Sequence, residues 1–155
     1  AVMDRLLATR QPIEVAGPFG DVTLSSSPPK SLAIIAAGTG AGQATSLIEA
    51  IAAEPERPRA HLWWSVATPL DLYQDPYFDD HQFSQWLTYR GFIDDRRGRN
   101  QLVPELATAP FLDADDFILC GPPGFVYAVT DALVALGVRR ERLRSDVYAW
   151  APRHR

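Results

Sequence analysis

The hydrophobic positions of the chain fall into two alternating patterns. Short apolar runs, rich in branched and aromatic residues, predict five β-strands, which cover residues 32–36, 61–66, 88–93, 116–120 and 145–150. Apolar residues at helical spacing predict helices over residues 43–53 and 125–136. Strands that are almost wholly apolar and that alternate with helices are typical of an α/β fold. We therefore expect three layers, with helices on both faces of a five-stranded, mainly parallel sheet.

The middle of the chain has a weaker pattern, because Pro69 and Pro76 interrupt it among many acidic and aromatic residues. Here we expect a short helix around residues 77–86, a loop at residues 96–99 and the start of another short helix at residues 102–106.

The first thirty residues differ from the rest of the chain. Residues 12–16 alternate like the end of a strand, and the serines and prolines of residues 25–29 are typical of a linker. We expect residues 31–155 to form the α/β domain and residues 1–30 to be the tail of a preceding domain followed by a linker.

Length, charge and cysteine content exclude several classes of protein. The 155 residues suit one domain with its own core. Nineteen acidic against fifteen basic residues give a net charge of −4, so we expect neither a nucleic-acid nor a membrane partner. The single cysteine, Cys120, excludes an internal disulfide framework and makes the cytoplasm the expected location. No apolar run approaches the roughly 20 residues of a membrane span.

A glycine-rich loop, residues 36–43, lies directly after a predicted strand and directly before a predicted helix. The free amides and the positive dipole end of such a helix favour phosphate binding. The usual dinucleotide fingerprint is not met, because Gln43 stands where the third glycine would be and no acid follows the strand near Ser65. A plain strand-to-helix turn is therefore an open alternative. A triphosphate loop is excluded, because no Gly-Lys-Ser/Thr ending is present.

A second loop, residues 120–125, also joins a predicted strand to a predicted helix. Two such loops on one parallel sheet favour a single ligand that lies across the carboxyl ends of the strands. Cys120 ends its strand at this candidate cleft, although a lone buried cysteine is more often an inert apolar residue.

Taken in order, these loops resemble those of the ferredoxin–NADP reductase superfamily, and most closely the bacterial NAD(P)H–flavin reductases and the reductase components of oxygenases. The resemblance covers nearly the whole chain. It rests on Gly17-Pro18-Phe19-Gly20, Ala37-Gly38-Thr39-Gly40, Leu62-Trp63-Trp64 with Asp71-Leu72-Tyr73, Cys120-Gly121-Pro122-Pro123-Gly124 and Asp146-Val147-Tyr148-Ala149-Trp150.

The resemblance implies an NAD(P)H-binding domain of a flavin-dependent oxidoreductase. Such a domain positions the nicotinamide of NADH or NADPH for hydride transfer to FAD or FMN, which is held by an N-terminal barrel absent from this chain. Residues 1–30 would be the tail of that barrel, and the chain alone is expected to be inactive. The implied partners are the flavin-binding domain and an electron acceptor such as free flavin, an iron–sulfur protein or an oxygenase.

The resemblance also implies which residues form the site. The first loop would contact the dinucleotide, the second would line its nicotinamide end with Cys120 as the catalytic position, and no metal is expected. The implied cofactor-binding residues are Gly38, Thr39, Gly40, Ala41, Ser65, Cys120, Gly121, Pro122, Pro123 and Phe125. Phe125 would lie toward the adenosine side, and Trp150 would cover the flavin in the full protein.

Departures from the family pattern leave other interpretations open. Ala37 replaces a usual glycine, and Ala67 stands where an arginine often pairs with the adenosine phosphate; the second change favours NADH over NADPH. Both changes are also compatible with a degenerate, non-catalytic interaction module of the same fold. The arginines between residues 139 and 144 form either a docking patch for an acidic partner or an ordinary solvated turn.

Overall fold

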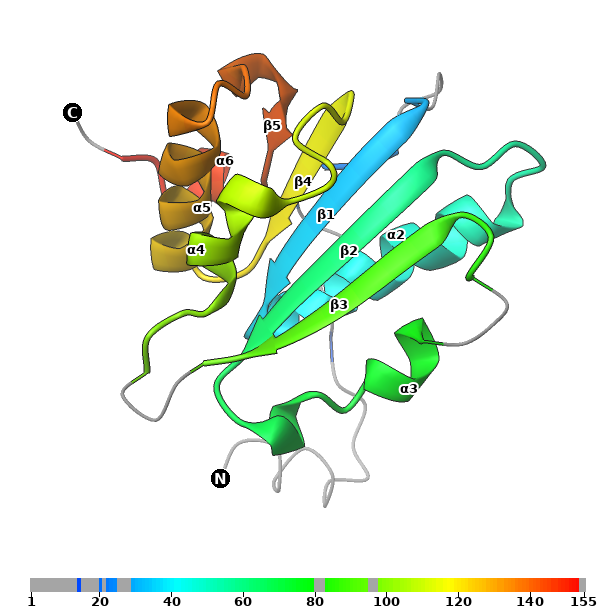
Figure 1. Cartoon of the computed structure of the whole chain (residues 1–155), viewed down its shortest axis with the longest axis horizontal. Helices are drawn as coiled ribbons and strands as arrows, with labels where there is room; N and C mark the ends of the chain where they lie inside the picture. The colour runs from blue at the N-terminus through cyan, green and yellow to red at the C-terminus, as the bar shows by residue number, and fades with distance from the viewer. Residues whose placement is uncertain are drawn as a thin grey trace.

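The computed structural model describes residues 14, 20, 22–24, 29–79, 83–94 and 98–153. Five strands form one sheet with the order β3-β2-β1-β4-β5, and every neighbouring pair is parallel (Figure 1). The strands are β1 (Ser31–Ala37), β2 (Arg59–Val66), β3 (Leu87–Ile93), β4 (Asp116–Cys120) and β5 (Leu143–Arg144). The predicted α/β fold with a five-stranded parallel sheet is confirmed.

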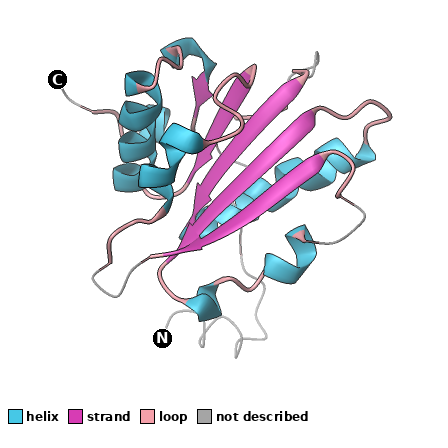
Figure 2. Cartoon of the chain, viewed as in Figure 1, coloured by secondary structure: helices cyan, strands magenta, loops and turns pink. Residues whose placement is uncertain are grey.

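Helices cover both faces of this sheet (Figure 2). Two long helices, α2 (Ala41–Ala53) and α5 (Pro123–Ala135), follow β1 and β4 and lie on opposite faces. The short helices are α3 (Asp75–Phe78), α4 (Leu102–Glu105) and α6 (Val147–Trp150), and further 3-10 turns lie at Gly38–Gly40, Pro69–Asp71, Leu106–Thr108 and Arg140–Arg142.

The alternation of side chains along β1 divides the core into two clusters. Leu32 and Ile34 pack with α2 on one face, whereas Ala33 and Ile35 pack with α4 and α5 on the other. All four side chains are fully buried. A strand that is buried on both faces explains the continuous apolar run of the sequence, and it fixes where the loop after β1 begins.

The prediction for the end of the chain is wrong in part. Residues 145–150 were expected to form a strand, but β5 is only Leu143–Arg144, and Val147–Trp150 form helix α6. The amides of Ala149 and Trp150 donate to the carbonyl of Asp146, at 3.0 and 3.3 Å, which closes the helical turn. Burial of Val147 against the core outweighs the strand preference of its neighbours.

The short helix expected around residues 77–86 is also misplaced. Helix α3 is Asp75–Phe78, and residues 83–86 form turns instead. Pro76 lies in the first turn of α3, where a missing N–H costs nothing, so the helix begins earlier than its apolar residues indicated. The helix expected to open at residues 102–106 is confirmed by α4.

Some expectations lie outside the described residues. They concern residues 12–16 apart from Glu14, residues 17–19, residues 25–28 and residues 96–97. In the part of the chain that the structure describes, no helix has the length and apolar character needed to cross a membrane.

Candidate functional site

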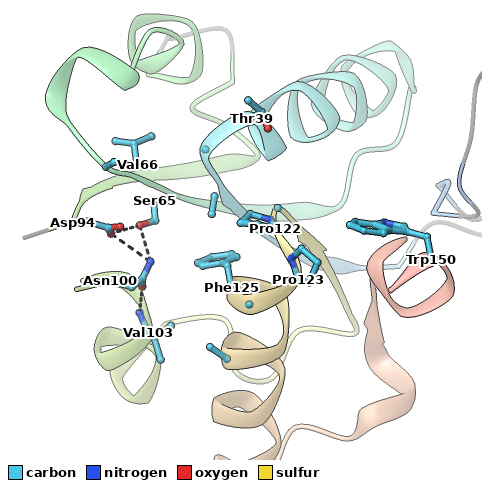
Figure 3. Close-up of a pocket in the computed structure, with 16 residues that line it drawn as sticks. Thr39, Ser65, Val66, Asp94, Asn100, Val103, Pro122, Pro123, Phe125 and Trp150 are labelled. Atoms are coloured by element: carbon cyan, nitrogen blue, oxygen red, sulfur yellow. Dashed lines mark hydrogen bonds between the residues drawn. The ribbon is translucent and has the colours of Figure 1, made fainter. Parts of the chain in front are cut away.

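A cavity of about 800 Å³ opens at the carboxyl ends of the central strands (Figure 3). Ala37 ends β1, Ser65 and Val66 end β2, Asp94 follows β3 and Gly121 follows β4, and all of them line the cavity. The strand order reverses between β1 and β4, where open parallel sheets typically bind ligands. The other lining residues are Gly38, Thr39, Ala67, Asn100, Val103, Pro122, Pro123, Gly124, Phe125, Ala128 and Trp150.

The two glycine-rich loops touch each other beneath this cavity. A Cβ at Gly40 would lie 2.5 Å from the carbonyl oxygen of Cys120, so only glycine fits between the loops. Gly121 has a φ of +148°, and its Cβ would lie 3.2 Å from that of Ala37. The loop after β1 is also anchored from β2, because Trp64 Nε1 donates to the carbonyl of Gly38 at 3.0 Å. The glycines therefore determine how the two helix starts are placed.

Both long helices begin next to the cavity. Among the described residues, no side chain caps the 3-10 turn Gly38–Gly40, the start of α2 or the start of α5. The first residue of α5 is Pro123, which has no N–H to satisfy. Free amides and two positive dipole ends at one cavity favour an anionic ligand.

The opposite end of the cavity holds a polar cluster that sequence reasoning missed. Ser65 Oγ donates to Asp94 Oδ1 at 2.9 Å, and Asn100 Nδ2 donates to Ser65 Oγ at 2.9 Å (Figure 3). No acid stands directly after the second predicted strand, where a ribose-binding acid is usually expected. Because β2 and β3 are parallel neighbours, with Ser65 opposite Phe92, the acid after β3 lies beside the end of β2. The sequence signal that could have indicated this cluster is Asp94, the acid directly after the third predicted strand.

Most of the expected site residues come together in the structure. Seven of them line the cavity: Gly38, Thr39, Ser65, Gly121, Pro122, Pro123 and Phe125. Gly40, Ala41 and Cys120 do not line it. Ala41 is fully buried, and its N–H donates to the carbonyls of the preceding turn.

The Cys120 side chain is buried on the α2 side of the sheet. Burial, and secondarily the nearby carboxylate of Asp146, raises the pKa of its thiol to about 12. The thiol is therefore neutral near pH 7 and unsuited to thiolate chemistry there. Its catalytic assignment stays a prediction.

A second cavity, of about 650 Å³, adjoins the first. Gly121 and Trp150 line both cavities, and the Trp150 side chain is 65% exposed at their junction. Asp146 lines the second cavity and accepts hydrogen bonds from Gln43 Nε2 at 2.9 Å and from the Val22 amide at 3.0 Å. These bonds connect the segment before β1 to α2 and to the start of α6.

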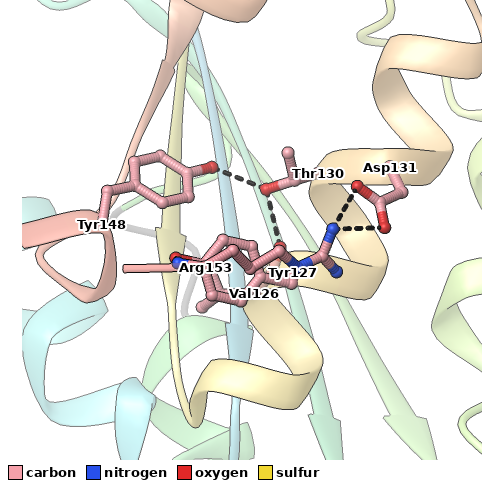
Figure 4. A network of polar contacts seen from close by, with 6 residues as sticks. All are labelled: Val126, Tyr127, Thr130, Asp131, Tyr148 and Arg153. Carbon is pink, nitrogen blue, oxygen red and sulfur yellow. Dashed lines mark hydrogen bonds and ion pairs between the residues drawn. The ribbon is translucent and has the colours of Figure 1, made fainter. Parts of the chain in front are cut away.

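A polar network holds α6 and the residues after it against α5 (Figure 4). Trp150 is the last residue of α6, so this network also holds its backbone in place. The hydroxyls of Tyr148 and Thr130 lie 2.6 Å apart, and Thr130 Oγ1 donates to the carbonyl of Val126 at 2.7 Å. Arg153 forms an ion pair with Asp131 at 2.8 Å and stacks on the ring of Tyr127. Tyr127 Oη donates to the carbonyl of Ala151 at 2.8 Å.

The arginines between residues 139 and 144 are largely engaged within the chain. Arg144 pairs with Asp116 at 2.6 Å, Arg142 donates to the Ala114 carbonyl at 3.4 Å, and Arg140 lies 4.3 Å from the centroid of the Tyr148 ring. These contacts favour the solvated turn over the docking patch. Among the described residues, no group of three or more His, Cys, Asp or Glu side chains could hold a metal ion.

No protein-family model matches the chain. It is 28% identical over 142 residues to NADH-cytochrome b5 reductase 1 of Lodderomyces elongisporus, covering 81% of this chain and 45% of that protein. It is 30% identical over 115 residues to the anthranilate 1,2-dioxygenase electron transfer component of Acinetobacter baylyi. That match covers 64% of this chain and 31% of that protein. The crystal structure of a cytochrome P450 reductase from Amycolatopsis shares the fold, with a TM-score of 0.67 and 22% sequence identity. The match covers 84% of this chain and 42% of that chain.

The chain is similar in sequence to these two reductases, and it shares its fold with the solved reductase structure. The chain spans less than half the length of each of these two curated relatives.

Proposed function

We propose that this chain is the NAD(P)-binding domain of a ferredoxin–NADP reductase-like flavin oxidoreductase. It binds NAD(P)H in the 800 Å³ cavity and presents the nicotinamide to a flavin held by a separate domain. The observation that carries the proposal is the convergence of two uncapped helix starts on one cavity at the switch point of the sheet. Ligand cavities typically measure roughly 300–1,000 Å³, so the space suits a ligand of this size.

The residues at the cavity fit a dinucleotide in three parts. Gly38 and Thr39, at the uncapped turn after β1, would hold the pyrophosphate with backbone amides. Ser65, at the end of β2, would face the adenosine half. Gly121 and Pro122, beside Trp150, would line the nicotinamide half. No step requires Cys120 as an acid or a nucleophile, because this domain aligns the reactants and does not transfer protons.

When bound, NAD(P)H would supply a hydride to a flavin that a separate domain holds. The second cavity, between Trp150, Asp146 and Gly20, is the place where we expect that domain to approach. In this proposal, residues 1–30 are the tail of the flavin-binding barrel with its linker, and residues 31–155 are the NAD(P)-binding domain. The relative named as a dioxygenase electron transfer component supports an oxygenase as the electron acceptor, and the relative named as a cytochrome b5 reductase supports an electron-transfer protein in that role.

Isothermal titration of the 155-residue chain with NADH, NADPH and adenosine diphosphate ribose tests the proposal. A matched pair of variants tests the location. Gly124 and Gly42 are both helical glycines whose added Cβ would meet nothing within 4 Å, but only Gly124 lines the cavity. We expect saturable binding that Gly124→Leu abolishes and that Gly42→Leu preserves. The absence of binding up to millimolar ligand would contradict the proposal and favour the non-catalytic interaction module.

A further inference from the structure

The indole of Trp64 anchors the first glycine-rich loop without lining the cavity. Its Nε1 donates to the carbonyl of Gly38 at 3.0 Å, and the Ala41 amide donates to the same carbonyl. Gly38 and Thr39 line the cavity, whereas Trp64 does not. The indole therefore acts on the cavity through the peptide unit that joins Gly38 to Thr39.

Packing in the core fixes the orientation of this indole. Trp64 is fully buried, and its ring meets the rings of Tyr73 and Phe78 edge-on, with centroids 5.5 and 6.2 Å apart. Its register partner on β1 is the small residue Ala36, which belongs to the same core cluster. Because protein interiors are close-packed, an indole held in this way presents its N–H in one direction.

The direction of the indole N–H also determines where the Thr39 amide points. A trans peptide unit is planar, so the carbonyl of Gly38 and the N–H of Thr39 point in opposite directions. With its carbonyl bound to Trp64 and Ala41, this peptide unit turns its N–H away from both donors. The first N–H groups of a helical turn have no partner within the helix, and no side chain of the described residues caps this turn. The Thr39 N–H therefore serves the cavity that Thr39 lines (Figure 3).

We propose that Trp64 is a positioning residue for the anionic part of the ligand: by holding the Gly38 carbonyl, it aims the Thr39 N–H at a pyrophosphate oxygen. This inference rests on the proposed function, since it requires the dinucleotide to occupy the cavity. The indole, the peptide unit and the phosphate then form a chain of hydrogen bonds, and the bonds of such a chain polarise and strengthen one another. A phosphate that accepts from Thr39 therefore also strengthens the bond from Trp64.

Proton–nitrogen NMR of the labelled wild-type chain, titrated with adenosine diphosphate ribose or with adenosine, tests the inference. Adenosine diphosphate ribose should move the Trp64 indole proton and the Thr39 amide proton downfield, and both shifts should saturate together. Adenosine has no phosphate and should move neither proton. The Trp63 indole is the control, because it is also buried but packs with Phe92 and Phe111 on the other face of the sheet.

A matched pair of variants separates the hydrogen bond from the packing. Trp64→Phe keeps an aromatic ring but removes the donor, and Trp63→Phe makes the same change in volume on the other face of the sheet. Thermal melting establishes that each variant is folded. We expect Trp64→Phe to weaken the binding of adenosine diphosphate ribose at least about fivefold and Trp63→Phe to weaken it less than about twofold. In Trp64→Phe, the Thr39 amide should lose its shift while the Gly121 amide keeps its own.

Three results would overturn the inference. They are equal weakening of binding by the two variants, a Thr39 shift that Trp64→Phe leaves intact, and binding of adenosine diphosphate ribose that leaves the Trp64 indole proton of the wild type unmoved. The last result decides the matter if Trp64→Phe does not fold. All three leave the proposed function intact, whereas that function itself fails if NADH, NADPH and adenosine diphosphate ribose all fail to bind.

Discussion

Gly40 provides the sharpest test of how the two loops are held together. A Cβ at this position would lie 2.5 Å from the carbonyl oxygen and 2.6 Å from the carbonyl carbon of Cys120, and 2.9 Å from the Gly121 amide nitrogen. All three contacts are with backbone, so no side chain can rotate away. Gly40→Ala must push the loop after β1 away from the loop after β4.

Gly40→Ala should destabilise the fold and weaken ligand binding. Overpacking a tight contact destabilises a protein by about 1–3 kcal/mol. In a domain of this size each kcal/mol lowers Tm by about 2–4 °C, so we expect a decrease of roughly 2–12 °C. Because both helix starts flank the cavity, the displacement should also weaken NADH binding by at least about tenfold.

Gly42→Ala supplies the control. Gly42 lies in helix α2, and an added Cβ would meet nothing within 4 Å. Alanine there should leave stability unchanged or raise it by up to about 1 kcal/mol, since glycine is the poorer helix former. Urea unfolding and thermal melting of the two variants measure the difference. If Gly40→Ala and Gly42→Ala have the same unfolding midpoint and bind NADH with the same affinity, the close approach of the two loops is refuted.

Three further predictions concern the rest of the fold. Burial lowers the pKa of His61 below its ordinary 6.5, so the unfolded chain binds more protons in acid and stability should fall as pH decreases through 6.5. Urea unfolding at pH 7.5 and 5.5 should show a smaller loss for His61→Leu than for the wild type; equal losses would contradict this. Cys120 is buried with its pKa raised to about 12, so a disulfide reagent at pH 8 should label it only after denaturation, and complete labelling of the native chain would be inconsistent with this burial. Arg144→Met should cost about 1–2 kcal/mol and Arg153→Met less than about 1 kcal/mol, because the Arg144 side chain is 31% exposed in its ion pair and that of Arg153 is 52% exposed. Chemical denaturation measures the stability loss of each variant. A larger loss for Arg153→Met than for Arg144→Met would rule out exposure as the reason for the difference.

The sequence predicted those parts of the site that depend on local chemistry. The loops after β1 and β4 were found because glycines follow apolar strands and precede helical periodicity, and both lie at the cavity. The positions of α2 and α5 followed in the same way from their apolar spacing, although each helix begins two residues earlier than predicted. Where residues close in sequence determine the conformation, the pattern of apolar residues and glycines was sufficient to predict the strand, loop or helix.

The parts that were missed depend on contacts between distant segments. Ser65 and Asp94 meet because β2 and β3 pair in a particular register, which no local pattern reveals. The direction of the Cys120 side chain depends on the alternation of β4, which places it with Ile118 on the α2 side. The turn at Asp146 forms through bonds to Val22 and Gln43, more than a hundred residues away, which strand preference could not indicate.

The central claim is that a dinucleotide lies across the carboxyl ends of the strands, between the Asp94 cluster and Trp150. The most direct measurement is amide NMR of the isotopically labelled chain during titration with NADH. The account predicts saturable shifts that cluster at Gly38, Thr39, Gly121 and Gly124, extend to Ser65 and Asn100, and are minor around the remote acid Asp113. Two results would contradict the claim that the dinucleotide lies here: shifts confined to amides elsewhere in the chain, or no shift of any amide up to millimolar NADH.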